Sequence, residues 1–131
     1  MALDPTNLSD EILDFLRERH LATLSVVRPD MSPHVTPVGF TWDNDAQLVR
    51  VITWTDAKKT RLLEAMGSSA VAVSQVDGGR WLTLEGIATV TTEPDACAEG
   101  CRRYAERYRE PADRPDRAVI EIGVTKILGR A

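Results

Sequence analysis

The spacing of apolar residues along the chain predicts a mainly β protein. Six segments either alternate apolar and polar residues or carry short apolar runs between turn-forming residues, which is typical of strands. They span residues 21–27, 33–42, 48–53, 70–76, 81–90 and 118–124. Short turns such as Asp77-Gly78-Gly79 join neighbouring segments, so these are expected to pair as antiparallel hairpins. Gly86 interrupts the fifth segment.

Three further segments carry the start signals of helices. A short amphipathic helix is predicted at about residues 9–20, because Ser9 can cap it and acidic residues occupy its first turn. Its inward face consists of Ile12, Leu13, Phe15 and Leu16. A second helix is predicted from Ala57 to Met66, and a third from Pro94 to about Tyr108.

Hairpin-ordered strands with helices as connections predict a small antiparallel barrel with helical flaps. The 131 residues suit a single domain, and 43% hydrophobic with 27% charged residues is ordinary for a folded globular chain. A domain of this size spends most of its apolar side chains on its own core. A large ligand is therefore expected to bind in a site shared with a partner chain.

The charge balance narrows the classes of partner. A net charge of −4 argues against a general nucleic-acid binder, which would be basic. The first thirty residues lack an apolar run long enough for a signal peptide or a membrane span, so the expected location is the cytoplasm.

The strongest local signal is the start of the second predicted helix. The chain has three lysines, and two of them, Lys58 and Lys59, lie in the first turn of this helix, which Thr55 or Asp56 is expected to cap. Free backbone N–H groups, the positive end of the helix dipole and two ammonium groups would converge there. The pattern indicates a phosphate or carboxylate site, and the alternative is a solvated run of charges.

Other reactive residue types give weaker signals. His20 and His34 have no carboxylate or cysteine at the spacing of a metal site or a catalytic triad, so no metal is predicted. Cys97 and Cys101 lie four residues apart in the third predicted helix and are interpreted as packing residues. Six arginines within residues 102–117 alternate with acids, which is typical of a salt-bridged surface, although one or two could bind a substrate carboxylate.

Several segments together resemble a known family. Residues 18–24, 33–40, 56–59 and 79–86, with Arg103 to Tyr108, resemble the split β-barrel flavin-binding family that includes pyridoxamine phosphate oxidases. The resemblance runs from about Thr6 to Leu128 and is strongest to the actinobacterial branch that uses the deazaflavin coenzyme F420, with its biliverdin reductase-like members. It implies a six-stranded split barrel that forms a homodimer.

The resemblance also implies two equivalent cofactor sites in grooves between the subunits. The second strand would line the ring system through His34, Val35, Thr36, Pro37 and Val38. The phosphate end would lie against Ile52, Thr53, Trp54, Ala57, Lys58 and Lys59, with Arg80 and Trp81 contributed by the partner chain. The same lysine pair is thus selected by the helix-dipole argument and by the resemblance.

The activity implied is hydride transfer from reduced F420 to a conjugated acceptor, with biliverdin as one candidate. Such a cofactor carries the chemistry itself, so no catalytic residue is assigned. Two alternatives stay open: an FMN-binding oxidoreductase similar to pyridoxamine phosphate oxidase, and a non-enzymatic carrier of a deazaflavin or tetrapyrrole. His34 stands where flavin-using relatives often carry arginine, which favours the deazaflavin.

Overall fold

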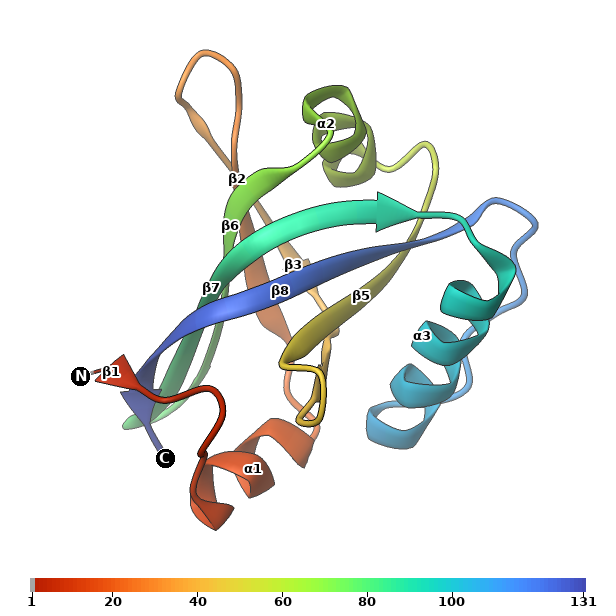
Figure 1. Ribbon diagram of the computed structural model, residues 1–131. Helices are drawn as coiled ribbons and strands as arrows, with labels where there is room; N and C mark the ends of the chain where they lie inside the picture. The colour runs from red at the N-terminus through yellow and green to blue at the C-terminus, as the bar shows by residue number, and fades with distance from the viewer. Residues whose placement is uncertain (1) are drawn as a thin grey trace.

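The computed structural model describes residues 2–131, and its centre is one strongly curved antiparallel sheet (Figure 1). Its strands run in the order β3-β2-β6-β7-β8-β5-β4, and β1 pairs with β8. They are β1 (Ala2–Leu3), β2 (Ala22–Val27), β3 (Pro33–Val38), β4 (Thr41–Asp43), β5 (Leu48–Trp54), β6 (Ser69–Asp77), β7 (Arg80–Thr91) and β8 (Arg117–Arg130). The helices are α1 (Asp10–Arg17), α2 (Lys58–Met66) and α3 (Pro94–Arg107).

The fold class is confirmed, and the number of strands is corrected from six to eight. The predicted strand 33–42 is in fact two strands, β3 and β4, because the backbone between them turns to α3. The N–H of Phe40 donates to the Tyr108 hydroxyl (3.2 Å), and its carbonyl accepts from Arg107 (2.7 Å). These bonds replace pairing with a neighbouring strand and leave β3 and β4 as the two edges of the sheet.

Strand β8 is longer than predicted because it pairs with β7 from Val119 to Arg130. The register of this ladder shifts between Glu85 and Gly86, so the interruption predicted at Gly86 is confirmed. A Cβ atom on Gly86 would lie 2.1 Å from the carbonyl oxygen of Gly123, so only glycine fits this close approach of two backbones.

The helices differ from their predictions mainly at their ends. Ser9 caps α1 by accepting from the N–H of Ile12 (3.3 Å), as expected. The helix ends at Arg17 rather than near residue 20, and the carbonyls of Glu18 and His20 instead accept bonds from α3 and the residue after it. None of the helices in residues 2–131 has the length and hydrophobicity that crossing a bilayer requires.

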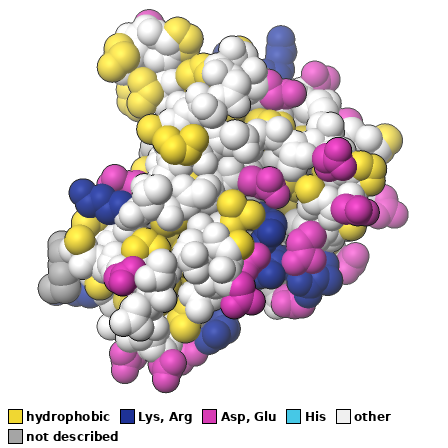
Figure 2. All heavy atoms as spheres, in the orientation of Figure 1, with side chains coloured by type: hydrophobic (Ala, Val, Ile, Leu, Met, Phe, Trp, Pro, Cys, Tyr) yellow, Lys and Arg dark blue, Asp and Glu magenta, His cyan; other side chains and the backbone are white. Residues whose placement is uncertain are grey.

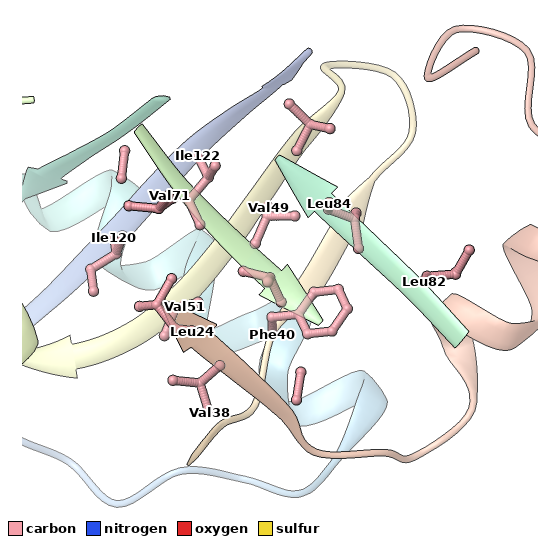
Figure 3. Packing of buried hydrophobic residues seen from close by; sticks show 14 of the residues in the cluster. Leu24, Val38, Phe40, Val49, Val51, Val71, Leu82, Leu84, Ile120 and Ile122 are labelled. Carbon is pink, nitrogen blue, oxygen red and sulfur yellow. The ribbon is translucent and has the colours of Figure 1, made fainter. Parts of the chain in front are cut away.

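The core lies inside the curve of the sheet (Figure 3). Large side chains point inward from β2, β3, β5, β6, β7 and β8 and from the bend between β3 and β4; the fully buried ones include Leu24, Phe40, Val49, Leu82, Leu84, Ile120 and Ile122. Phe15 of α1 is also fully buried and belongs to this core. Helix α3 packs against β4, β5 and β8 (Figure 1). This framework fixes the edge strand β3, strand β5 and α3 around one cleft.

Candidate functional site

A cleft of about 670 Å³ opens between β3, β5, the start of α2 and the segment that follows α3. It is lined by Thr36, Pro37, Val38, Gly39, Val51, Ile52, Trp54, Lys59, Tyr104, Arg109, Glu110, Pro111, Ala112, Arg114 and Arg117. The lining carries four cationic side chains and one carboxylate, so the cleft favours an anionic ligand.

One end of the cleft is a cationic corner built on Trp54. The Lys59 Nζ lies 5.2 Å from the centroid of the Trp54 ring, and the Arg114 guanidinium carbon lies 4.6 Å from it. Lys59 is half-buried, and this burial lowers the pKa of its ammonium group. A poorly hydrated ammonium gains more from an anionic partner than an exposed one does.

Hydrogen bonds hold this corner rigidly. The hydroxyls of Thr53 at the end of β5 and Thr60 in α2 lie 3.0 Å apart in a buried pair. Arg117 donates to the carbonyls of Thr53 (3.3 Å) and Ala112 (2.6 Å). The end of β5, the first turn of α2 and the segment after α3 are therefore fixed relative to one another.

Helix α2 begins without a side-chain cap. Its N-cap is Ala57, which has no hydroxyl or carboxylate to accept from the first-turn N–H groups, so the predicted caps Thr55 and Asp56 are wrong. These N–H groups are left available at the positive end of the helix dipole. A bound anion can accept from them, which is a frequent arrangement at helix N-termini. Gly67 ends the helix with a φ of 77°, a conformation that suits glycine.

The other end of the cleft is more apolar and closely packed. The rings of Tyr104 and Tyr108 lie 4.8 Å apart, and both face the backbone of Gly39. A Cβ atom at Gly39 would lie 2.9 Å from the Tyr104 ring, so a larger residue would displace it. Thr36 to Val38 continue this wall along the edge strand β3.

Six of the residues predicted from the sequence line this cleft: Thr36, Pro37, Val38, Ile52, Trp54 and Lys59. Thr53 and Ala57 are buried beside it. Lys58 lies in an adjoining hollow with Asp56 and Arg61. Val35 is 55% exposed on the outer side of β3.

His34 lies opposite the buried Val26 in the β2–β3 ladder, and its Nδ1 atom is buried without a hydrogen-bond partner in residues 2–131. Burial lowers the pKa of His34, and the positive charges of Arg28, Lys58 and Lys59 lower it further. Its imidazole is therefore neutral at neutral pH.

Arg80 and Trp81 lie at the start of β7 and do not line the cleft of their own chain. Arg80 donates to both carboxylate oxygens of Glu18 (2.9 Å each), pairs with Asp77 and stacks over Phe15 at 4.4 Å. The bonds to Arg80 lower the pKa of Glu18 to about 2. Contact of Arg80 with a partner's cofactor remains a prediction.

The sequence did not indicate that His20 would lie beside two carboxylates, Glu18 and Asp77, because Asp77 is distant from it in the chain. Ligand atoms of Glu18, His20 and Asp77 lie within 4.8 Å of one another. Both carboxylates also bind the Arg80 guanidinium, which offsets one of their two negative charges.

Four cleft residues were not among the predicted cofactor-binding residues: Tyr104 in α3, Arg109 and Arg114 in the segment after it, and Arg117 at the start of β8. The predicted salt-bridged surface is correct for Arg102, which pairs with Glu99 (2.8 Å) and Glu106 (2.6 Å). Figure 2 shows cations and acids intermixed on this side of the molecule. The prediction of a salt-bridged surface is wrong for Arg107, which is half-buried and binds neutral groups. Both arginines lie in the same alternation of acids and arginines, so the sequence pattern could not distinguish the surface Arg102 from the half-buried Arg107.

Cys97 and Cys101 are free thiols on α3, half-buried as expected of packing residues. The Cys97 thiol donates to the carbonyl of Arg117 at 3.6 Å. Burial raises the pKa of Cys97, which keeps it protonated.

Comparisons with known proteins agree with this geometry. The model of the family described as "Pyridoxamine 5'-phosphate oxidase" matches residues 8–131. The chain is 48% identical over 126 residues to the F420H(2)-dependent biliverdin reductase of Mycobacterium tuberculosis, covering 96% of this chain and 90% of that protein.

Two solved structures have a similar fold. A conserved hypothetical protein of Mycobacterium tuberculosis has a TM-score of 0.77 at 22% identity, covering 95% of this chain and 85% of that one. A protein described as an F420 reductase has a TM-score of 0.72 at 26% identity, covering 92% of this chain and 98% of that one.

Proposed function

Since the chain belongs to the pyridoxamine 5'-phosphate oxidase family, we propose that it is an oxidoreductase that uses reduced coenzyme F420 to reduce biliverdin or a similar conjugated molecule. The relative that is 48% identical is an F420H(2)-dependent biliverdin reductase, and the likeness extends over 96% of this chain.

One observation of the structure carries the proposal. The cleft joins a cationic corner at Lys59, Trp54 and Arg114 to an apolar wall at Thr36–Gly39. A flat ring system with an anionic tail matches both ends at once. The volume of about 670 Å³ also lies within the usual range of small-molecule sites.

Each part of the cleft has a role in this proposal. Lys59, Arg114 and the uncapped first turn of α2 would bind the anionic tail of the cofactor. Thr36, Pro37 and Val38 would line its ring system and exclude water from one face. When bound, the cofactor supplies the hydride, and the protein supplies binding and orientation.

The same cleft suits an acidic conjugated substrate. Biliverdin is a flat molecule that carries carboxylates, and Arg109 lies in the cleft between the tyrosine end and the loop 110–112. An arginine can hold a carboxylate bidentately, which would orient the substrate over the ring-binding wall.

FMN remains the alternative cofactor, because its phosphate would also suit the corner at Lys59.

The activity is tested directly with purified protein, reduced F420 and biliverdin. We expect biliverdin to be consumed in step with oxidation of the cofactor, because binding at one site would bring the acceptor next to the hydride donor. Parallel assays with reduced FMN and binding titrations of both cofactors complete the experiment. Turnover with FMN alone would support the alternative cofactor, and tight binding without turnover would support a carrier instead of an enzyme.

We also infer that the protein acts as a homodimer with its cofactor sites between the subunits. The outer sides of β2, β3 and β7 expose Val27 (42%), Val35 (55%) and Ile87 (50%). A hollow of about 330 Å³ extends over this face along Val27, Ala70, Ala72 and Ile87. A concentration of exposed apolar side chains supports a protein contact. Strand β3 belongs both to this face and to the cleft, so a partner seated here would lie beside the cofactor.

Changing Ile87 to lysine is expected to convert the dimer to monomers, because a charge would be buried in the apolar contact. Analytical ultracentrifugation measures the change, and Ile87→Leu serves as the matched control that keeps the apolar surface. We also expect weaker cofactor binding in the lysine variant. A wild-type protein that sediments as a monomer at micromolar concentration would contradict the dimer.

A further inference from the structure

A second hollow, of about 300 Å³, shares no lining residue with the cleft. It lies between α1, β4 and the last turns of α3. Three arginines reach it, Arg17, Arg103 and Arg107, together with the apolar side chains of Leu16 and Trp42.

Arg107 brings a half-buried positive charge to this hollow. Its guanidinium donates to the carbonyls of Glu18 (2.8 Å) and Phe40 (2.7 Å) and to the side-chain oxygen of Gln75 (2.5 Å), which are all neutral acceptors. The ion pairs within residues 2–131 do not include Arg107. Burial lowers the pKa of Arg107, which shows that its charge is poorly solvated. Buried charges in proteins are normally paired with a counter-charge.

Thr41 lines the same hollow and carries an unpartnered hydroxyl. Its side chain is 6% exposed, and its hydroxyl is buried without a hydrogen-bond partner in residues 2–131. Buried hydroxyls nearly always have a hydrogen-bond partner, so a buried hydroxyl without one beside a hollow indicates a missing ligand atom.

The remaining charges around the hollow are already paired. Arg17 binds Asp14 (3.0 Å), Arg103 binds Asp43 (3.2 Å) and Glu99 (2.6 Å), and the one carboxylate of the lining, Glu106, binds Arg102. No protein carboxylate is therefore committed to Arg107, and the local charge is positive.

We propose that this hollow is a second ligand site, which binds a carboxylate carried on a small flat or apolar body. Arg107 supplies the unpaired cation, the Thr41 hydroxyl supplies a hydrogen bond, and Arg17 closes the outer rim. The indole of Trp42 and the side chain of Leu16 supply the apolar wall. The site is separate from the cofactor cleft and does not depend on the function proposed above.

The indole N–H of Trp42, which donates to Asn44 (3.1 Å), provides a local NMR reporter. We expect sodium benzoate to shift this resonance to saturation in the ¹⁵N-labelled full chain, whereas neutral benzamide leaves it in place. Inorganic phosphate, which has charge but no apolar body, is expected to bind about tenfold more weakly than benzoate. Phosphate binding as tightly as benzoate would overturn the assignment to a carboxylate on an apolar body.

Two variants locate the binding. Thr41→Val has the same shape without the hydroxyl, and Arg17→Gln removes an exposed cation, so each is expected to weaken benzoate binding by about tenfold while the chain stays folded. Lys126→Gln removes an exposed cation of β8 that lies outside the hollow, so it is the control and should bind as the wild type does. The proposal is wrong if benzoate moves only the Trp54 indole resonance, which reports on the cleft, or if Thr41→Val binds benzoate unchanged.

Discussion

Replacing Lys59 with alanine is expected to weaken the binding of coenzyme F420 by about a hundredfold. Of the two neighbouring lysines, Lys59 is the one that lines the cleft, 5.2 Å from the Trp54 ring and in the uncapped first turn of α2. Its half-buried ammonium is poorly hydrated, so an anionic tail that pairs with it gains more than it would at the surface. Fluorescence titration of the cofactor measures the loss.

Lys58 provides the matched control, since it is the same residue type one position earlier. It is exposed and lies in the adjoining hollow with Asp56 and Arg61. Lys58→Ala is therefore expected to weaken cofactor binding much less than Lys59→Ala does. Equal losses in the two variants would show that the anion is held by the general positive field of the helix start and not by Lys59.

The pH dependence of binding gives a second readout for Lys59. Burial lowers the pKa of its ammonium below the ordinary value of 10.5. The charged form binds the anion, so affinity is fully present below this lowered pKa and falls as the pH rises through it. We expect the decline in alkaline solution to be absent from Lys59→Ala, because the variant has no titrating group at that position.

Replacing Arg107 with leucine is expected to lower the free energy of unfolding by about 3 kcal/mol. The guanidinium satisfies the carbonyl of Phe40 and the side-chain oxygen of the fully buried Gln75, and it stacks on the Phe40 ring at 4.6 Å. Leucine cannot donate to either acceptor, so both would be left inside the protein without their strongest partner. Urea denaturation followed by circular dichroism measures the change.

Arg102→Leu separates this loss from the general effect of removing an arginine from α3. Arg102 is exposed and binds Glu99 and Glu106 on the surface, so its replacement should leave stability nearly unchanged. A small effect in both variants would show that water reaches the Phe40 and Gln75 acceptors.

We also expect Arg107→Leu to loosen the cleft wall, since Phe40 adjoins Gly39, which the two tyrosines cover.

Much of the fold could be predicted because its signals are local. Alternating residues define the strands, Ser9 caps α1, Gly67 ends α2 and Gly86 marks the bulge in β7. The break between β3 and β4 could not be predicted in this way. It depends on hydrogen bonds that Phe40 accepts from Arg107 and donates to Tyr108, two residues that are distant in sequence.

The candidate site also has features that the sequence could predict and features that it could not. The sequence singled out Lys59 because a lysine pair at a helix start is a local electrostatic pattern, and the family resemblance added Trp54. It could not separate Lys59, which lies in the cleft, from Lys58, which does not. Nor could it distinguish Arg102 on the surface from Arg107, whose neighbours come from three other parts of the chain.

The sequence by itself determined the mainly β class, the positions of most strands and helices, and the lysine pair at a helix start that is the candidate anion site. These features follow from side-chain periodicity and backbone chemistry within a few residues. Only the tertiary structure decided which cations share one enclosed volume, because burial and charge pairing arise when distant segments pack together. Arg109 and Arg114 became cleft residues, and Arg107 an unpaired buried cation, through the way in which α3 and its following segment meet the edge of the sheet.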